Sequence, residues 1–221
     1  MGIAEKRNPH YYPKTGQTGP ELGNYGGVKM KKNLVVLSAV AVLFPLSAMA
    51  GQGDWLVRGR VIQVDPSESS TLNLGVSTNT VPELDFSYFV TSNVALELIL
   101  GTSRHEVSLG GASLGKVSLL PPTLTAQYHF SPGAQISPYV GAGINYTRFY
   151  DVGLTSPLDV SKNSWGGALQ AGMDIAVGKT TFINLDVKKI YVKTDVTSGG
   201  TKIDTLKIDP VVFGVGFGMR F

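Results

Sequence analysis

Histidine and serine are the residue types in this chain that could carry out acid–base or nucleophilic chemistry, because the 221-residue sequence contains no cysteine. His10, His105 and His129 do not share the H-E-x-x-H spacing of a zinc protease. Ser103 and Ser108 flank His105, and such a pair at the rim of a small barrel could transfer acyl groups, but no third residue that would orient the histidine is evident. We therefore predict no catalytic site, no metal site and no cofactor.

Polar and apolar residues alternate along much of the chain, which places the two kinds on opposite faces of β-strands. From Gly51 onward the alternation occurs in eight segments, with no helical period and no long apolar run. The predicted strands span residues 54–65, 82–91, 93–103, 118–130, 138–150, 163–177, 181–193 and 207–221. Most reach the length of about ten residues that a tilted membrane-spanning strand needs.

Each predicted strand has one apolar face, such as Leu96, Leu98 and Leu100, while the opposite face carries charged residues. No helix is present to cover either face of an open sheet. Closing the sheet in lipid turns the apolar face outward and pairs every backbone group. We therefore predict an all-β fold, an eight-stranded antiparallel up-and-down transmembrane β-barrel. A soluble lipocalin is the main alternative, but it would normally have an apolar interior and a helix.

The connections between the predicted strands alternate in length. The short ones are Ser92, 131–137 and 178–180, and the longer polar ones are 66–81, 104–117, 151–162 and 194–206. Short periplasmic turns and longer outer loops are typical of outer-membrane barrels. An even strand number then places both termini in the periplasm, so the sequence predicts a protein of the Gram-negative outer membrane.

The first fifty residues do not share the strand pattern. Lys31 and Lys32 precede an apolar run at 34–46, and Ser47-Ala48-Met49-Ala50 supplies the small residues of a cleavage site. This arrangement is typical of a secretory signal peptide. We assign residues 30–50 to the signal peptide, residues 1–29 to an upstream extension outside the mature protein, and residues 51–221 to the barrel.

The net charge of +3 would suggest a weakly basic protein, but the excess is concentrated near the N-terminus. Residues 1–50 hold six of the 19 Lys and Arg residues and two of the 16 Asp and Glu residues, which leaves 13 basic and 14 acidic residues from Gly51 onward. The predicted mature chain is close to neutral and has no basic patch for a phosphate backbone. Nucleic acid is therefore not an expected partner.

Several longer runs carry a family resemblance. They are Thr91–Leu98, Leu120–Leu124, Gln127–Phe130, Pro138–Thr147, Ser164–Gly166 and Gly216–Phe221, of which the fourth, Pro-Tyr-Val-Gly-Ala-Gly-Ile-Asn-Tyr-Thr, is the most specific. With them the predicted mature chain resembles the OmpW family of outer-membrane proteins over essentially its whole length. The resemblance implies a narrow, partly apolar lumen that binds or passes small hydrophobic molecules. Phe221, as a terminal aromatic residue, resembles the signal read by the barrel-insertion machinery.

Charged residues on the inward face come in nearly balanced numbers. We assign five of them to a plug of the lumen: Arg58, Glu97, Asp174, Asp186 and Arg220. Buried charges need partners, so a balanced set predicts a salt-bridged block across the barrel. A proton or ion path is the alternative for the same residues.

Beyond the plug, toward the outer end, the inward face becomes more apolar. The residues predicted to contact a ligand there are Ile62, Val64, Ile99, Phe149, Lys188, Ile190 and Val212. Ordinary barrel packing would give the same pattern. The family resemblance implies large inward side chains at the positions of Ile99 and Lys188. A lysine in place of an aromatic residue makes an apolar gate there doubtful unless its stem does the packing.

Pro121 and Pro122 open one predicted strand and cannot donate to its ladder, so they predict a candidate lateral exit. The alternative is a strand that simply begins at the loop edge. The expected partners are outer-membrane lipid and a small hydrophobic ligand, and no pattern specifies an oligomeric state. A structural or adhesive barrel, whose outer loops bind partners, is the alternative function.

Overall fold

The computed structural model describes residues 51–221, and the predicted signal peptide and upstream extension lie outside the described residues. The strands are β1 (Trp55–Asp65), β2 (Leu74–Val76), β3 (Asn79–Phe89), β4 (Val94–Gly101), β5 (Ser103–Leu109), β6 (Ala112–Leu120), β7 (Thr123–His129), β8 (Ile136–Leu154), β9 (Leu158–Val160), β10 (Asn163–Ala176), β11 (Thr181–Ile190), β12 (Lys193–Ser198), β13 (Thr201–Lys207) and β14 (Val211–Arg220). No helix within residues 51–221 is long and apolar enough to cross a membrane.

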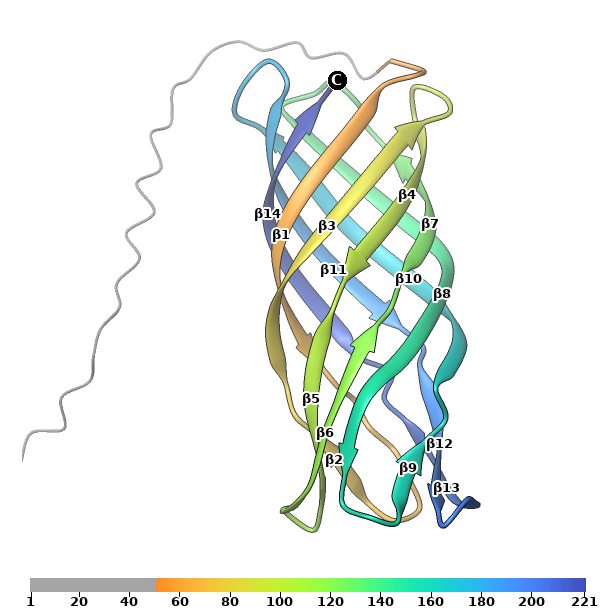
Figure 1. The fold of residues 1–221 in the computed structure, drawn as a ribbon. Helices are drawn as coiled ribbons and strands as arrows, with labels where there is room; N and C mark the ends of the chain where they lie inside the picture. The colour runs from red at the N-terminus through yellow and green to blue at the C-terminus, as the bar shows by residue number, and fades with distance from the viewer. Residues whose placement is uncertain (1–50) are drawn as a thin grey trace, which may run out of the picture. The chain divides into compact units, whose positions relative to one another are not determined.

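Eight of these strands form a closed wall, which confirms the predicted antiparallel barrel (Figure 1). Around the wall the order is β1, β3, β4, β7, β8, β10, β11 and β14, and pairing of β14 with β1 closes the ring. Reciprocal backbone bonds join Trp55 and Phe221, with N–O distances of 3.1 and 2.8 Å. The two ends of the described segment therefore lie together at one end of the barrel.

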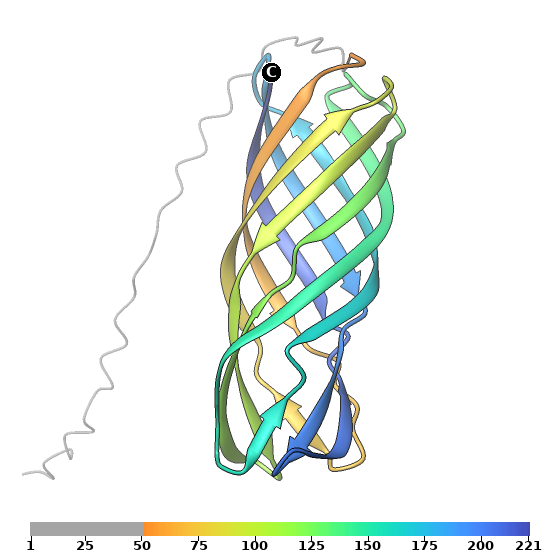
Figure 2. The same ribbon diagram turned by 45° about the vertical axis from the view of Figure 1, so that its right-hand side comes forward.

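The two ends of the barrel differ in construction (Figures 1 and 2). One end, here called the turn end, carries the short connections 90–93, 130–135 and 177–180. At the other, the hairpin end, β4 is followed by the β5–β6 hairpin, and β11 by the β12–β13 hairpin. At the hairpin end, these two hairpins therefore lengthen the wall beyond the eight strands of the closed ring.

Two of the predicted loops were wrong, because residues 104–117 and 194–206 largely form the β5–β6 and β12–β13 hairpins. Their inward positions, such as Val107 and Val196, are buried and apolar, so the period of two continues. The outward positions are polar, which gave these segments a loop-like composition. Tight glycine turns close both hairpins, with positive φ at Gly110, Gly111, Gly199 and Gly200.

The barrel has the sidedness of a protein in lipid. Leu98 of β4 and Leu124 of β7 are cross-strand partners and are 40% and 46% exposed, whereas Arg58 and Glu97 inside the barrel are fully buried. In water this distribution would leave a continuous apolar surface without cover. In a bilayer it places hydrocarbon against leucine and keeps the charges within the wall.

Aromatic pairs mark both edges of the apolar belt. Trp55 and Tyr88 lie near the turn end with ring centroids 5.1 Å apart, and Tyr146 and Trp165 lie toward the hairpin end, 4.8 Å apart. Tryptophan and tyrosine favour the two membrane–water interfaces. Arg104, on the outward face of β5, forms an exposed ion pair with Asp151. The β5–β6 hairpin therefore lies beyond the hydrocarbon.

Candidate functional site

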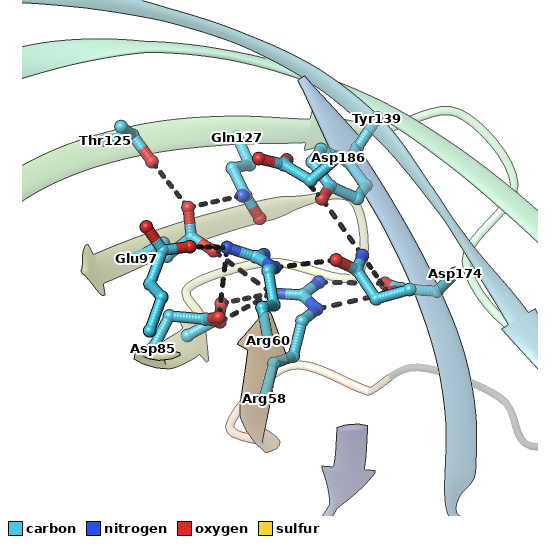
Figure 3. A network of polar contacts seen from close by, with 12 residues as sticks. Arg58, Arg60, Asp85, Glu97, Thr125, Gln127, Tyr139, Asp174 and Asp186 are labelled. Carbon is cyan, nitrogen blue, oxygen red and sulfur yellow. Dashed lines mark hydrogen bonds and ion pairs between the residues drawn. The ribbon is translucent and has the colours of Figure 1, made fainter. Parts of the chain in front are cut away.

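The middle of the lumen is filled by a set of buried charged side chains, which we call the charged layer. Its members are Arg58, Arg60, Glu83, Asp85, Glu97, Asp174, Asp186 and Lys188. Alternation along five wall strands turns them all inward. Figure 3 labels Arg58, Arg60, Asp85, Glu97, Asp174 and Asp186 of this layer, together with polar neighbours from other strands.

Arg58 binds three carboxylates. Its Nε and Nη2 donate to the two oxygens of Asp174 at 3.1 and 2.8 Å, and its Nη1 donates to Asp85 at 3.1 Å and to Glu97 at 3.3 Å. The paired geometry with Asp174 is the strong, two-bond form of an arginine–carboxylate contact. Arg58 therefore links β1 to β3, β4 and β10 across the lumen.

Arg60 and Lys188 complete the cationic part of the charged layer. Arg60 contacts Glu83, Asp85 and Glu97 at 2.9, 3.1 and 3.1 Å. Lys188 contacts Glu83 at 2.6 Å and Asp186 at 2.9 Å. Every carboxylate in the charged layer thus has at least one cation within ion-pair distance.

Neutral side chains supply further donors to the same carboxylates. Gln127 donates to Glu97 at 2.7 Å and Thr125 donates to it at 3.1 Å, while Tyr139 donates to Asp186 at 2.7 Å (Figure 3). The charged layer has five carboxylates and three cations, so cations alone would leave the carboxylates under-satisfied. These donors stabilise a buried cluster that would otherwise cost a large desolvation free energy.

Arg220 lies nearer the turn end and outside this network. Its guanidinium carbon is 5.1 Å from the ring centre of Phe89 and 4.9 Å from that of Phe182. Within residues 51–221 its Nε and Nη1 have no hydrogen-bond partner. Leu56, Phe89, Ala95 and Phe182 form an apolar cluster around it. Among the described residues Arg220 forms no ion pair, and cation–π contacts hold it in the lumen.

A cavity lies on the hairpin side of the charged layer and is mostly apolar. Ile62, Ile99, Ile190, Val192 and Val212 are buried and line it. The space open to the centres of water-sized molecules is about 50 Å³, several times the roughly 10–15 Å³ that one water needs. The cavity therefore suits a slender ligand, and bulkier ones require side chains to move.

The wall beside this cavity is interrupted where β4 meets β5 and β6 meets β7. The pairings Ile99 with Thr123 and Ser103 with Leu119 keep one register on both sides of the break. Between them lie Pro121 and Pro122, which have no N–H to donate across the gap. Pro121 lines the cavity, so the apolar space reaches this weakened part of the wall, which we call the proline seam.

Ser103 and His105 lie at the rim of the cavity. His105 Nδ1 is 2.5 Å from the carbonyl oxygen of Ser77, and its Nε2 is 2.9 Å from Ser103 Oγ. Burial lowers the pKa of His105 below its usual value of 6.5, while the Ser77 carbonyl opposes that shift. The third, orienting group that the sequence did not reveal is thus a backbone carbonyl.

Gly111–Gly115 has G-x-S-x-G spacing but does not form a nucleophile elbow. It spans the end of the turn between β5 and β6 and the first residues of β6, whereas the elbow of a hydrolase joins a strand to a helix. Ser113 pairs with Ser108 across this hairpin and is exposed. Within residues 51–221, neither Ser108 nor Ser113 forms a hydrogen bond with a histidine.

The structure separates the predicted ligand residues into two groups. Five line the cavity: Ile62, Val64, Ile99, Ile190 and Val212. Phe149 is buried in the adjoining apolar cluster and Lys188 belongs to the charged layer, so neither lines the cavity. The stem of Lys188 therefore does not form an apolar gate. Of the predicted plug residues, Arg58, Glu97, Asp174 and Asp186 lie in the charged layer and Arg220 does not.

Several residues of the site were missed. Arg60, Glu83 and Asp85 were not assigned to the plug, although they take part in five ion pairs of the charged layer. Tyr139 could have been found, because it alternates with outward Pro138 and Val140 on β8. Pro210 also lines the cavity, at a second break between β13 and β14, and its missing N–H was the available signal.

Comparison with known proteins decides the family. The model of the OmpW family matches residues 51–221. The chain belongs to the OmpW family. It is 42% identical over 188 residues to the uncharacterized outer-membrane protein y4mB of Sinorhizobium fredii, covering 78% of this chain and 82% of that protein. It is 36% identical to outer membrane protein W of Escherichia coli, covering 87% of this chain and all of that protein.

The fold is also similar to that of a solved outer-membrane protein. The crystal structure of OprG from Pseudomonas aeruginosa superposes with a TM-score of 0.70 at 28% identity, covering 79% of this chain and 98% of OprG. This OmpW-family chain is thus an outer-membrane barrel, as the sequence predicted. The turn end is then periplasmic and the hairpin end extracellular.

Proposed function

We propose that this protein admits small hydrophobic molecules from the extracellular end into the apolar cavity and releases them sideways through the proline seam. The observation that carries the proposal is the position of the cavity. The cavity lies directly beyond the charged layer, and Glu83 belongs to that layer and also lines the cavity. The cavity extends to Pro121 in the wall. Apolar pockets with a few polar groups are typical of small-molecule sites.

The charged layer makes an axial route unfavourable for such molecules. A hydrophobic ligand that moved along the axis would have to separate Arg58 from Asp174 and Arg60 from Glu97 without replacing their contacts. Leaving buried charges unpaired costs several kcal/mol, on the order of 3–5 for a broken pair. A path through the proline seam breaks no ion pair of the charged layer and leads into hydrocarbon.

Filling the cavity tests the first part of the proposal. Ile99→Trp adds bulk inside the lumen, and Leu98→Trp adds the same bulk to the lipid-facing side of the neighbouring position. Intact Gram-negative cells that express the protein should take up an apolar fluorescent dye faster than cells without it. We expect Ile99→Trp to remove that gain and Leu98→Trp to keep it. Equal uptake by both variants would contradict the proposal.

Stapling the proline seam tests the second part. The chain has no cysteine, so Thr102→Cys with Leu120→Cys would introduce one disulfide across the seam, in the register that flanks it. Leu98→Cys with Leu124→Cys places a matched staple across a regular pair of β4 and β7. We expect only the seam staple to slow dye uptake, and reduction to restore it. Unchanged uptake with a closed seam would exclude the lateral route.

A further inference from the structure

The cavity contains a small number of polar groups whose hydrogen-bonding capacity is unevenly used. Its hydroxyl and carboxylate residues are Glu83, Thr102, Ser103, Thr123 and Thr147. A hydroxyl has one hydrogen to donate and two lone pairs, and a carboxylate only accepts. Whether the cavity can donate a hydrogen bond to a ligand, or only accept one, therefore depends on which protein groups the hydroxyl hydrogens already bind.

Ser103 donates its hydrogen to His105. The Ser77 carbonyl can only accept, so Nδ1 of His105 carries the hydrogen of their 2.5 Å contact. Because burial holds the pKa of His105 below 6.5, the ring is neutral at pH 7 and its Nε2 is an acceptor. Ser103 must then donate across the 2.9 Å contact with Nε2. The lone pairs of Ser103 Oγ remain available to a ligand.

The two threonines deeper in the cavity follow the same rule. Thr147 donates to Asn145 Oδ1 at 2.7 Å. Thr123 donates to the carbonyl of Pro121 at 3.0 Å while it accepts from Asn145 Nδ2 at 2.8 Å. Both hydroxyls have therefore given their only hydrogen to the protein.

Glu83 adds an acceptor at the base of the cavity. Arg60 and Lys188 both donate to its Oε1, at 2.9 and 2.6 Å. Its Oε2 is left as an acceptor in a side chain that lines the cavity. Ser103, Thr147 and Glu83 thus present oxygen lone pairs to the apolar space without offering a hydrogen.

We propose that this cavity selects hydrophobic molecules that bear a hydroxyl donor, such as an alcohol or a phenol, over hydrocarbons, ethers and ketones of the same size. The inference rests on the proposed function and specifies its substrate class. A hydroxyl can donate to a lone pair of the cavity, whereas an ether oxygen faces it with a second lone pair. Sites built to hydrogen-bond a substrate group discriminate strongly against analogues that lack it.

Three probes of similar size test the proposal. 1-Pentanol and methyl butyl ether are isomers that differ in the donor, and n-hexane is the apolar reference. Displacement of a bound fluorescent dye from the protein in lipid nanodiscs would measure binding, with Ile99→Trp as the background for lipid partitioning. We expect the alcohol to bind about tenfold more tightly than the ether, as one buried hydrogen bond provides. Equal binding of the isomers would overturn the inference.

Variants identify the acceptors. Ser103→Ala and Thr147→Val, made singly and together, remove lone pairs with little change of volume, and Thr80→Val is a matched control on the outward face of β3. We expect the double variant to lose most of the preference for the alcohol and to bind hexane as the parent does. An unchanged preference would overturn the assignment to these residues.

Hexane binding shows whether a failed result rejects only this inference or also the proposed function on which it rests. Hexane binding without preference for the alcohol rejects only the donor rule. Binding of the alcohol alone, lost in the double variant, supports the donor rule and contradicts a general hydrophobic carrier. If none of the three probes displaces the dye, both proposals are rejected.

Discussion

Arg58 and Asp174 form a two-bond ion pair inside the barrel although 116 residues separate them in the sequence, with donor–acceptor distances of 3.1 and 2.8 Å. Arg58 comes from β1 and Asp174 from β10, and two other wall strands lie between them on the shorter side of the ring. The pair therefore ties distant parts of the wall together through the lumen. Buried pairs of this kind add little net stability over apolar packing, but breaking one is costly.

Replacing Arg58 should strongly destabilise the barrel. Arg58→Met keeps most of the volume but leaves Asp85, Glu97 and Asp174 with fewer cations, so we expect a loss of about 3–5 kcal/mol. Urea unfolding in detergent micelles, followed by tryptophan fluorescence, would measure the change. Arg104→Met is the matched control, because its ion pair with Asp151 is exposed and should contribute no more than about 1 kcal/mol. Similar losses for both variants would contradict a structural role for the charged layer.

Gly172 should be intolerant of a side chain for a reason specific to the site. An added Cβ would overlap the hydroxyl of Tyr139, which donates to Asp186. We expect Gly172→Ala to cost about 1–3 kcal/mol, as overpacking does, in the same unfolding measurement. Gly167→Ala is the control, since the nearest atoms to its added Cβ are 3.8 Å away.

A double variant tests the cause of that cost. Tyr139→Phe removes the overlapping hydroxyl, so part of the Gly172→Ala loss should disappear in the Tyr139→Phe background. Strictly additive losses would show that the cost comes from contacts that Tyr139→Phe leaves in place, namely the approach of the added Cβ to the ring carbon Cζ of residue 139 and to the carbonyl of Leu185.

Weakening the charged layer should make the barrel leak cations. Arg60→Ala removes one of three cations that face five carboxylates, so the remaining negative charge increases. In planar bilayers we expect the parent protein to conduct little, and Arg60→Ala to conduct more with selectivity for K⁺ over Cl⁻. Arg104→Ala should behave as the parent does. Substantial conductance by the parent, unchanged in Arg60→Ala, would favour the alternative of an ion path.

Sequence reasoning identified the wall strands and which side chains point inward, because both follow from a period of two. Arg58, Glu97 and Asp174 were each placed in the lumen on this basis, and each is buried there. Their specific pairing could not be predicted in the same way. The height of a residue in a barrel depends on strand tilt and on the register around the whole ring, and both are set by closure.

The extracellular hairpins show a second limit of the sequence. Ser103, His105 and Val107 of β5 continue the inward face of β4, yet polar outward residues gave the segment the composition of a loop. Beyond the bilayer, water replaces lipid outside the wall, so the apolar outward face is no longer required. This is why the part of the cavity lining nearest the hairpin end, including Ser103 and His105, was not assigned to the ligand site.

Asp204 should make the extracellular end sensitive to acid. Its carboxylate accepts backbone N–H bonds from Leu72 at 2.9 Å, from Thr205 at 2.7 Å and from Thr71 at 3.3 Å. These bonds hold the pKa of Asp204 below its usual 3.8, and the bond from Leu72 has the largest effect. A lowered pKa in the folded state means that the stabilisation is complete above the pKa of the unfolded group and is lost as pH falls through the folded value.

Amide hydrogen exchange would detect this change locally. We expect protection of the Leu72 amide to stay constant between pH 7 and about 5. Protection should be lost only below pH 3.8, because the lowered pKa of Asp204 delays its uptake of a proton. The Ser69 amide is an internal control, because it donates to the backbone carbonyl of Lys207, which does not titrate. Asp204→Asn should abolish the pH dependence at Leu72, since an amide oxygen accepts at every pH. Equal loss of protection at both amides would instead indicate that the whole hairpin end opens in acid.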